Sequence, residues 1–366
     1  MRKKTKIMSI KITKDFVKKL PKTELHVHLD GSLRIDTIFD LAKKYNVKLP
    51  RKSKEKLKDL ICCDKKCESL EDYLRGFEVT LSVLQHTNAL DRAAYELAED
   101  AAKENIKYME VRFSPILHTR KGSKLTDICD AVLNGLRKAE KKYDILTGVI
   151  ICGIRNMDPA TSLKLAELAV AYKHKGVIGF DLAGAEYNHP AKDHAEACDL
   201  VKKNHLNITI HAGEAYGPLS IEQALHSCNA HRIGHGTHLI EDGDLLNFMN
   251  DHRIPIEICL TSNLHTKAVE RIESHPVQLF IDYGLRVTLN TDNRLISNTT
   301  LTDEFMLLLD KFDVDYMDIK NIIINGFKSA FLPYRHRVRL INQALNDMEK
   351  LEETELKNKI KIEEKI

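Results

Sequence analysis

Apolar runs alternate with amphipathic segments along most of this chain. Near-continuous apolar runs, such as residues 145–152, are typical of strands that are buried on both faces of a parallel sheet. Apolar residues that recur every three or four positions, as in residues 126–140, predict amphipathic helices. The strand and helix patterns follow one another eight times, which indicates a protein of the α/β class.

The expected strands are short, and each is followed by an expected helix. The strands are expected near residues 24–29, 107–113, 145–152, 177–183, 207–211, 232–235, 254–259 and 285–290. The helices are expected at residues 35–45, 69–105 (as two helices), 126–140, 161–174, 192–203, 219–228, 242–251, 276–283 and 318–366. Eight such units predict a (β/α)8 TIM barrel with a helical insertion after strand 1 and extra C-terminal helices. A doubly wound open sheet is the alternative, but it expects a Gly-rich phosphate turn after its first strand, where this chain has histidines.

Length and charge further limit the possible domain organisation, partners and location of the protein. The chain has 366 residues, of which 43% are hydrophobic, and we expect residues 1–366 to form a single domain. Its ends, residues 1–18 and 352–366, are rich in charge and are expected to be flexible or solvated. The net charge of +3 does not indicate a nucleic-acid partner. No apolar run approaches about 18 residues, and the basic N-terminal stretch lacks the apolar middle of a signal peptide, so we expect a cytoplasmic protein that does not cross a membrane.

The eight cysteines favour a reducing compartment. Most of them lie singly in apolar runs, which is typical of buried free thiols. Cys62, Cys63 and Cys67 lie close together in a Lys-rich segment at residues 51–67. They could form half of a metal cluster, but no matching second half follows, so we expect a solvated loop there.

Two histidines at the end of the first expected strand introduce the candidate chemistry. Side chains alternate faces along a strand, so His26 and His28 project from the same face. Asp30 adds a carboxylate, and Gly31 allows the chain to turn sharply out of the strand. A pair of imidazoles at a strand end is half of a metal site, although an isolated His-x-His also occurs at ordinary polar strand edges.

Polar groups also follow other expected strands, and the carboxyl ends of barrel strands form the active-site face. From strands four, five, six and eight they are Asp181 and Gly184, His211 and Glu214, His235, and Asp292 and Asn293. Together, three nitrogens and one oxygen are available to a metal ion from His26, His28, His211 and Asp292. This donor set suits Zn²⁺, one ion per chain, with a position left for water.

Five segments form a specific set of motifs along the chain. They are residues 24–32 (ELHVHLDGS), 181–184 (DLAG), 211–214 (HAGE), 232–236 (RIGHG) and 289–292 (LNTD). In sequence and order these segments resemble those of the adenosine deaminase family of metal-dependent amidohydrolases, between about residues 20 and 335. The resemblance implies a zinc-dependent hydrolase of the TIM-barrel fold. Such an enzyme deaminates adenosine, and 2′-deoxyadenosine with it, to inosine or deoxyinosine and ammonia in purine metabolism.

The resemblance also implies the catalytic roles. The residues that match the family's zinc ligands are His26, His28, His211 and Asp292. His235 matches the water-activating histidine, and Asp292 would also orient the water. Glu214 matches the donor of a proton to purine N1, a role that requires a carboxyl group protonated at neutral pH.

The same resemblance implies how a purine nucleoside would bind. The Gly184 N–H matches the donor to N3, where a Cβ would crowd the purine. Asp30, with His28, matches the group that faces the ribose 5′-hydroxyl. Asn293 stands where most of the family has a second aspartate that donates to N7, and an amide NH₂ can donate there without titrating. A hydrophobic lid over the ribose, with plain helix core as the alternative, is expected from Leu70, Tyr73, Leu74 and Phe77.

Asp30 favours nucleosides over nucleotides. A carboxylate about 4 Å from a 5′-phosphate costs on the order of 4 kcal/mol per unit charge at an effective dielectric near 20. The alternative functions are deamination of a related 6-aminopurine, namely an aminofutalosine-type compound, adenine or a 5′-modified adenosine. The remote alternative is an inactive binding homologue, which the presence of Glu214 and of all four zinc ligands disfavours. The sequence leaves the oligomeric state open.

Overall fold

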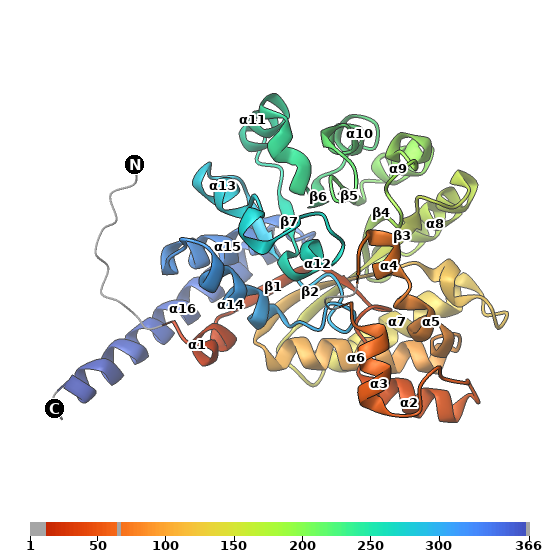
Figure 1. The fold of residues 1–366 in the computed structure, drawn as a ribbon, viewed down its shortest axis with the longest axis horizontal. Coiled ribbons are helices and arrows are strands. Elements are labelled where there is room, and N and C mark those ends of the chain that lie inside the picture. Colours follow the sequence, from red (N-terminus) through yellow and green to blue (C-terminus); the bar gives the residue numbers. More distant parts are fainter. Residues whose placement is uncertain (1–11, 64–66, 364–366) are drawn as a thin grey trace.

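Eight parallel strands form the centre of the molecule in the computed structural model, which describes residues 12–63 and 67–363. The strands are β1 Lys22–His28, β2 Ile106–Phe113, β3 Leu146–Ile154, β4 Val177–Ala183, β5 Asn207–Ala212, β6 Arg232–His235, β7 Ile256–Ile258 and β8 Val287–Leu289. They pair in sequence order from β1 to β8, and helices surround them (Figure 1). This order excludes the doubly wound sheet, in which the strand order reverses at a switch point.

Backbone contacts between β1 and the residues after β8 bring the two ends of the sheet together. Val27 and Asp292 form a parallel bridge. The N–H of Asp292 donates to the carbonyl of His26 at 2.9 Å, and the N–H of His28 donates to the carbonyl of Asp292 at 2.7 Å. The predicted (β/α)8 barrel is therefore confirmed, and its closure places Asp292 between two histidines.

Helices cover the outside of the barrel, and extra helices occupy the two predicted places. The insertion after β1 contains α2 Ile35–Lys44, α3 Lys54–Ile61, α4 Leu70–Leu74, α5 Phe77–Val83 and α6 Thr87–Lys103. The helices that follow later strands are α7 Leu125–Glu140, α8 Pro159–Ala171, α9 Ala195–Lys203, α10 Pro218–His226, α11 Gly243–Asp251, α12 Leu260–His265 and α13 Val277–Asp282. The chain after β8 forms α14 Leu301–Lys311, α15 Tyr316–Ser329 and α16 Tyr334–Glu363. Short 3-10 helices are η1 Pro115–His118, η2 Lys173–Lys175, η3 Ala191–His194, η4 Thr237–Glu241 and η5 Ile272–Ser274.

The insertion differs from the prediction in two details. Helix α3 lies in the segment that we expected to be a loop, where Ser53 caps the helix and Leu57 and Ile61 are buried. Residues 69–105 form three helices rather than two, because the chain breaks between α4 and α5 at Gly76. A Cβ at Gly76 would lie 2.8 Å from the carbonyl oxygen of Ile61, so only glycine fits this close approach.

The ends of the chain are more structured than predicted within the described residues. Residues Lys14–Lys19 form helix α1, in which Phe16 and Val17 are buried. The expectation of a flexible segment is therefore wrong for residues 14–18, because these apolar side chains join the core. Residues 352–363 continue helix α16, where Glu352 accepts hydrogen bonds from Tyr316 and Lys320. Residues 1–11 and 364–366 lie outside the described residues.

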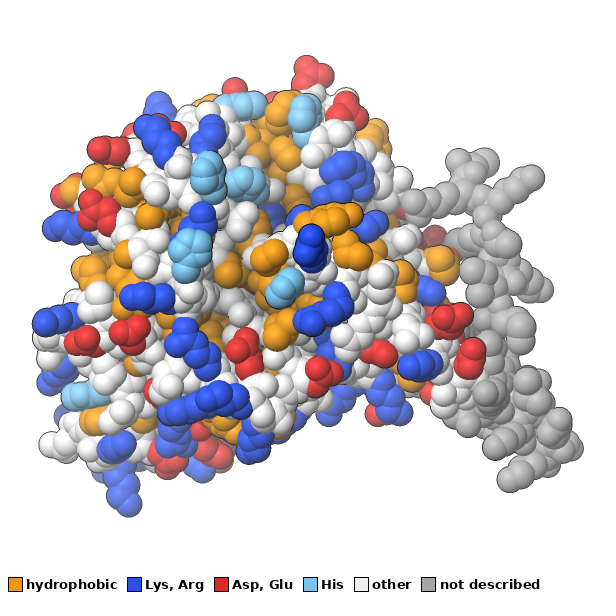
Figure 2. Space-filling model, turned by 180° about the vertical axis from the view of Figure 1, so that it is seen from behind, with side chains coloured by type: hydrophobic (Ala, Val, Ile, Leu, Met, Phe, Trp, Pro, Cys, Tyr) orange, Lys and Arg blue, Asp and Glu red, His pale blue; other side chains and the backbone are white. Residues whose placement is uncertain are grey.

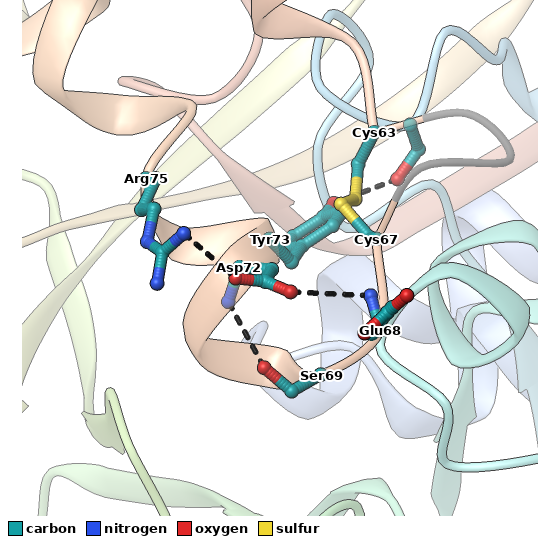
Figure 3. Close-up of a disulfide and its surroundings, with 8 residues drawn as sticks. Cys63, Cys67, Glu68, Ser69, Asp72, Tyr73 and Arg75 are labelled. Carbon is teal, nitrogen blue, oxygen red and sulfur yellow. Dashed lines mark hydrogen bonds and ion pairs between the residues drawn. A yellow bond between two sulfur atoms is a disulfide. The ribbon is translucent and has the colours of Figure 1, made fainter.

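Cys63 and Cys67 correct the prediction of a solvated loop. A disulfide joins them, with 5.6 Å between their Cα atoms, and both side chains are buried (Figure 3). The N–H of Cys63 donates to the carbonyl of Ile296 at 2.8 Å, which attaches this segment to the loop after β8. Free and buried thiols, as predicted, are those of Cys129, Cys152, Cys198, Cys228 and Cys259. Residues 64–66, between the two bonded cysteines, are outside the described ranges.

The surface mixes both signs of charge. Figure 2 shows Lys and Arg side chains interspersed with Asp and Glu over one face of the molecule, in keeping with the small net charge. Among residues 12–63 and 67–363, no helix combines the length and the apolar character needed to cross a membrane.

Candidate active site

A cavity of roughly 200 Å³ lies at the carboxyl ends of the strands. It is lined by side chains from β1, the insertion and the loops after β4, β5, β6 and β8. These include His28, Asp30, Leu70, Tyr73, Phe77, Gly184, His211, Glu214, His235, Asp292 and Asn293. The barrel therefore brings the predicted site residues to one place, apart from His26, which is buried beside the cavity.

A buried cluster of imidazoles and one carboxylate could hold a metal ion. The cluster consists of His26, His211, His235 and Asp292. Each offers one ligand atom, and these four atoms all lie within 4.8 Å of one another. His28 also reaches this cluster, because its Nε2 lies 3.1 Å from Nε2 of His211 and 3.3 Å from Oδ1 of Asp292. His26 Nε2 has the matching distances, 3.1 Å to His211 and 3.3 Å to Asp292.

Buried carboxylates orient two of these imidazoles. His26 Nδ1 lies 2.9 Å from Oε2 of Glu257, and His211 Nδ1 lies 3.1 Å from Oδ1 of Asp181. Arg112 bridges the two acids, donating to Glu257 at 2.9 Å and to Asp181 at 3.1 Å. Because an ionised carboxylate can only accept, Nδ1 carries a proton in each ring, and Nε2 is the nitrogen that faces the cluster.

A chain of hydrogen bonds sets the tautomer of His235. The N–H of Val277 donates to Nδ1 of His275 at 3.0 Å, which leaves the proton of His275 on Nε2. That Nε2 donates to Oδ1 of Asn263 at 3.2 Å, and Nδ2 of Asn263 in turn donates to Nδ1 of His235 at 2.9 Å. Burial lowers the pKa of His235 well below its usual value, so the ring is neutral. Its single proton is therefore on Nε2, 3.6 Å from Oε2 of Glu214.

Asp292 is held in its ionised form. Burial opposes ionisation, but the hydrogen bond and the charge of His26 hold the pKa of Asp292 well below its usual value. The hydroxyl of Ser262 donates to its second oxygen, Oδ2, at 2.6 Å. Oδ1 is the oxygen nearest to the imidazoles, so a metal ion at the cluster would meet an anionic ligand.

The pKa of Glu214 is shifted in the opposite direction to that of Asp292. Its side chain is only 4% exposed, and Oε1 has no hydrogen-bond partner within the described part of the chain. Burial, followed by the negative charges of Asp292 and Glu186, raises the pKa of Glu214 well above its usual value. The raised pKa favours the protonated carboxyl group, which can act as an acid at the cavity.

Asp30 lies at another part of the cavity wall, buried beside a neutral histidine. Burial raises the pKa of Asp30 to about 7. Its Oδ2 lies 3.8 Å from Nε2 of His118, and burial lowers the pKa of His118 to about 4. The Nδ1 of His118 lies 3.0 Å from the carbonyl of Leu84 and donates to it, so its Nε2 carries no proton.

Gly184 and Asn293 occupy tight positions in the wall. Gly184 has a φ of +96°, and a Cβ there would lie 2.8 Å from Oδ1 of Asn156, so this backbone requires glycine. Asn293 is 2% exposed and packs against Gly31, where a Cβ would lie 1.8 Å from its Oδ1. The carboxamide is thus fixed at the cavity, with Oδ1 lacking a hydrogen-bond partner among the described residues.

The four hydrophobic residues of the expected lid all line the cavity. They are Leu70, Tyr73 and Leu74 of α4, and Phe77 of α5. The Tyr73 hydroxyl lies 2.7 Å from the hydroxyl of Ser297, which ties α4 to the loop after β8. These side chains therefore do more than pack helices together, and their position over a ribose remains a prediction.

The sequence analysis missed three residues that support the site. Glu257 interrupts an apolar strand as a lone charge, a pattern that predicts a buried partner. Asn263 lies on α12, and the sequence gives no sign that its amide contacts His235. Glu186 follows Gly184 by two residues, inside a loop whose conformation the periodic patterns do not describe.

An eight-stranded parallel barrel with a buried His/Asp cluster at the carboxyl ends of its strands defines a class of protein. This is the TIM-barrel amidohydrolase class, in which side chains from different strands converge on one site.

Comparisons with known proteins give the family. Residues 21–346 match the model of the adenosine deaminase family. An adenosine deaminase of Clostridium botulinum (strain 657 / Type Ba4) is 41% identical over 323 residues, which cover 88% of this chain and 98% of that protein. A Dictyostelium discoideum protein named a probable adenosine deaminase is 42% identical over 321 residues, covering 88% of this chain but only 42% of that longer protein. The solved structure of an amidohydrolase from Burkholderia ambifaria with bound Zn has a TM-score of 0.87 at 23% identity, covering 95% of this chain and 97% of that one. The chain belongs to the adenosine deaminase family.

Proposed function

We propose that this protein hydrolyses adenosine, and 2′-deoxyadenosine, to inosine or deoxyinosine and ammonia, as a step of purine salvage. One observation carries the proposal: a His/Asp cluster and a carboxyl group that keeps its proton meet in a single cavity. Deamination at C6 of adenine requires an attacking hydroxide and a proton for ring N1, and the cavity contains a group for each task. The cytoplasmic location remains a prediction.

The cluster suits zinc, with His26, His28, His211 and Asp292 as its ligands. Ligand atoms can share one zinc ion only when they lie close together, because each would bond to the ion at about 2.0–2.2 Å. The four ligand-atom distances of 3.1–3.3 Å in this set meet that requirement. A bound zinc ion lowers the pKa of a coordinated water to about 7 and so supplies hydroxide at neutral pH.

The chain's own residues move the protons. Glu214 gives its proton to N1 of the purine, which makes C6 more electrophilic. The resulting carboxylate then takes the proton of the new C6 hydroxyl and passes it to the leaving amino group, and the proton released when water ionises restores the acid. His235 donates from Nε2 and, with Asp292, orients the attacking oxygen toward C6. Overall, the C6–N6 bond breaks, a C6–O bond forms, and one water is consumed for each ammonia released.

Three groups place the nucleoside. The N–H of Gly184 donates to N3, and the carboxamide NH₂ of Asn293 donates to N7. Asp30 binds the 5′-hydroxyl, which donates to Oδ1, an atom that has no hydrogen-bond partner within the described part of the chain. No Lys or Arg is among the described residues that line the cavity, so a 5′-phosphate would find no cation to pair with.

An ultraviolet assay tests the proposal with adenosine, 2′-deoxyadenosine, adenine and AMP as parallel substrates. We expect both nucleosides to be deaminated and adenosine to exceed AMP by at least about 100-fold in kcat/KM, since each 1.4 kcal/mol of discrimination is a factor of ten. Chelation of the metal should abolish the activity, and added Zn²⁺ should restore it. Equal rates for AMP, or full activity in metal-free protein, would contradict the proposal. Activity confined to adenine or to nucleosides with a larger 5′ group would support the alternative substrates.

A further inference from the structure

Glu186 has a set of contacts that the proposed reaction does not yet explain. It lies in the loop after β4, and its side chain is 4% exposed. Its carboxylate accepts hydrogen bonds from three consecutive backbone N–H groups of the loop after β5. Oε1 accepts from Gly213 at 2.7 Å, and Oε2 accepts from Glu214 at 3.0 Å and from Ala215 at 2.6 Å.

The conformation of the β5 loop explains why these amides converge. Gly213 has a φ of +67°, and a Cβ there would lie 2.6 Å from Cδ1 of Ile221. A left-handed residue next to ordinary ones turns successive N–H groups toward one point and forms an anion-binding concavity. The carboxylate of Glu186 occupies this concavity, and hydrogen bonds to an ionised group are about twice as strong as neutral ones.

The neighbouring contacts make the same loop rigid on its other side. The carbonyl of Gly213 accepts from the hydroxyl of Thr237 at 2.7 Å and from the N–H of His238 at 3.1 Å. Arg155 lies 3.8 Å from Oε1 of Glu186 and donates to the carbonyl of His211 at 2.7 Å. The backbone on both sides of Glu214 is therefore fixed, while Oε1 of its carboxyl group has no hydrogen-bond partner among the described residues.

We propose that Glu186 is a positioning residue for the reaction: by binding the amides of residues 213–215, it holds the Glu214 carboxyl group at the purine edge. The inference rests on the proposed function, because it assumes that Glu214 protonates N1. Positioning matters strongly for such a step, since an error of about 1 Å in a catalytic group can cost on the order of 100-fold in rate.

A carboxylate is required for this contact, and a carboxamide cannot replace it. Both oxygens of Glu186 accept, so three N–H groups are satisfied by two acceptors. Glutamine has one oxygen and an NH₂ group that only donates, so at least one backbone N–H would face another donor. Glu186→Gln has nearly the same size and therefore disturbs the loop without opening a cavity.

Steady-state kinetics of Glu186→Gln test the inference, with zinc content and thermal stability measured beside them. We expect kcat with adenosine to fall about 30- to 100-fold, while KM, the bound zinc and Tm change little. The matched control is Glu140→Gln, because Glu140 also accepts a backbone N–H and a hydroxyl, from Thr147, but at the opposite end of the barrel. This control should keep the wild-type kcat.

A double-mutant cycle shows whether Glu186 acts through Glu214. Adding Glu186→Gln to Glu214→Gln should reduce kcat by less than about threefold further, because the group being positioned is already gone. An undiminished 30- to 100-fold loss in that background, or a wild-type kcat in Glu186→Gln alone, would overturn the inference. A loss of zinc or a marked fall in Tm in Glu186→Gln would also overturn it and indicate a general structural role. The proposed function fails separately, if the wild-type protein does not deaminate adenosine or if Glu214→Gln is fully active.

Discussion

Asp292 and Glu214 are two of the carboxyl groups that line the cavity, and their pKa values are shifted in opposite directions. Asp292, after β8, and Glu214, after β5, are each 4% exposed. Asp292 lies among imidazoles that keep its pKa low, whereas Glu214 is buried near other acids and its pKa is raised. The surroundings thus favour the ionised form of one carboxyl group and the protonated form of the other, as the proposed roles of anionic ligand and proton donor require.

The contacts that fix the backbones of Asp292 and Glu214 differ as well. Asp292 is fixed by the closure of the barrel, through backbone hydrogen bonds to His26 and His28. Glu214 lies on a loop, and its backbone is fixed by the carboxylate of Glu186. The sheet itself therefore places the proposed metal ligand, and a contact between two loops places the proposed acid.

Replacement of Asp292 by asparagine should reduce the zinc content and kcat/KM more than any other change. Asp292→Asn keeps the shape of the side chain but removes the one anionic ligand of the cluster. We expect the zinc content to fall well below one ion per chain and kcat/KM to fall by at least about 10⁴-fold. Metal analysis and steady-state kinetics would measure this, with Asp303→Asn, at a surface ion pair with Lys14, as a control that keeps both zinc and activity. An Asp292→Asn variant with full zinc and full activity would remove the distinction between the two carboxyl groups.

Loss of Glu214 should have the next largest effect and leave the metal in place. Glu214→Gln cannot give a proton to N1, so we expect kcat to fall about 10³-fold, or about 4 kcal/mol in activation free energy. The zinc content should stay at one ion per chain, in contrast to Asp292→Asn. Loss of zinc together with activity would show that Glu214 supports the metal site instead.

The pH dependence should follow the raised pKa of Glu214. The acid works only when protonated, so kcat should be retained below this pKa and lost as the pH rises through it. The pKa is raised, so this alkaline limb should begin at a higher pH than an ordinary carboxyl group allows. A kcat profile of the wild type against the residual activity of Glu214→Gln would measure it. If the same limb remained in the variant, another group would be responsible.

Replacement of Asn293 by aspartate should change the activity least. Asn293→Asp puts a fourth carboxyl group at the cavity, next to Asp292 in sequence and buried like it. Burial and the nearby negative charge should keep the new group protonated, so that it still donates to N7. We expect activity at neutral pH within about tenfold of the wild type, measured with adenosine. A folded variant without activity would show that the two donors are not interchangeable.

The sequence predicted the part of the site that depends on strands. Buried strands have apolar runs and period-two alternation, so the barrel, the strand ends and the His26/His28 pair could all be located. It did not predict the contact of Glu186 with the β5 loop, because side-chain contacts between loops have no periodic pattern. The Cys63–Cys67 disulfide was missed for a related reason, since burial of that segment depends on packing against the loop after β8.

The central claim is that Glu214 is protonated and Asp292 is ionised in the same zinc-loaded protein at neutral pH. Infrared difference spectroscopy between the wild type and Glu214→Gln, each with one zinc ion per chain, tests this most directly. We expect the variant to lose a carbonyl stretching band of a protonated carboxyl group and to keep the carboxylate bands of the metal site. Loss of a carboxylate band instead, with no protonated carboxyl band in the wild type, would contradict the account.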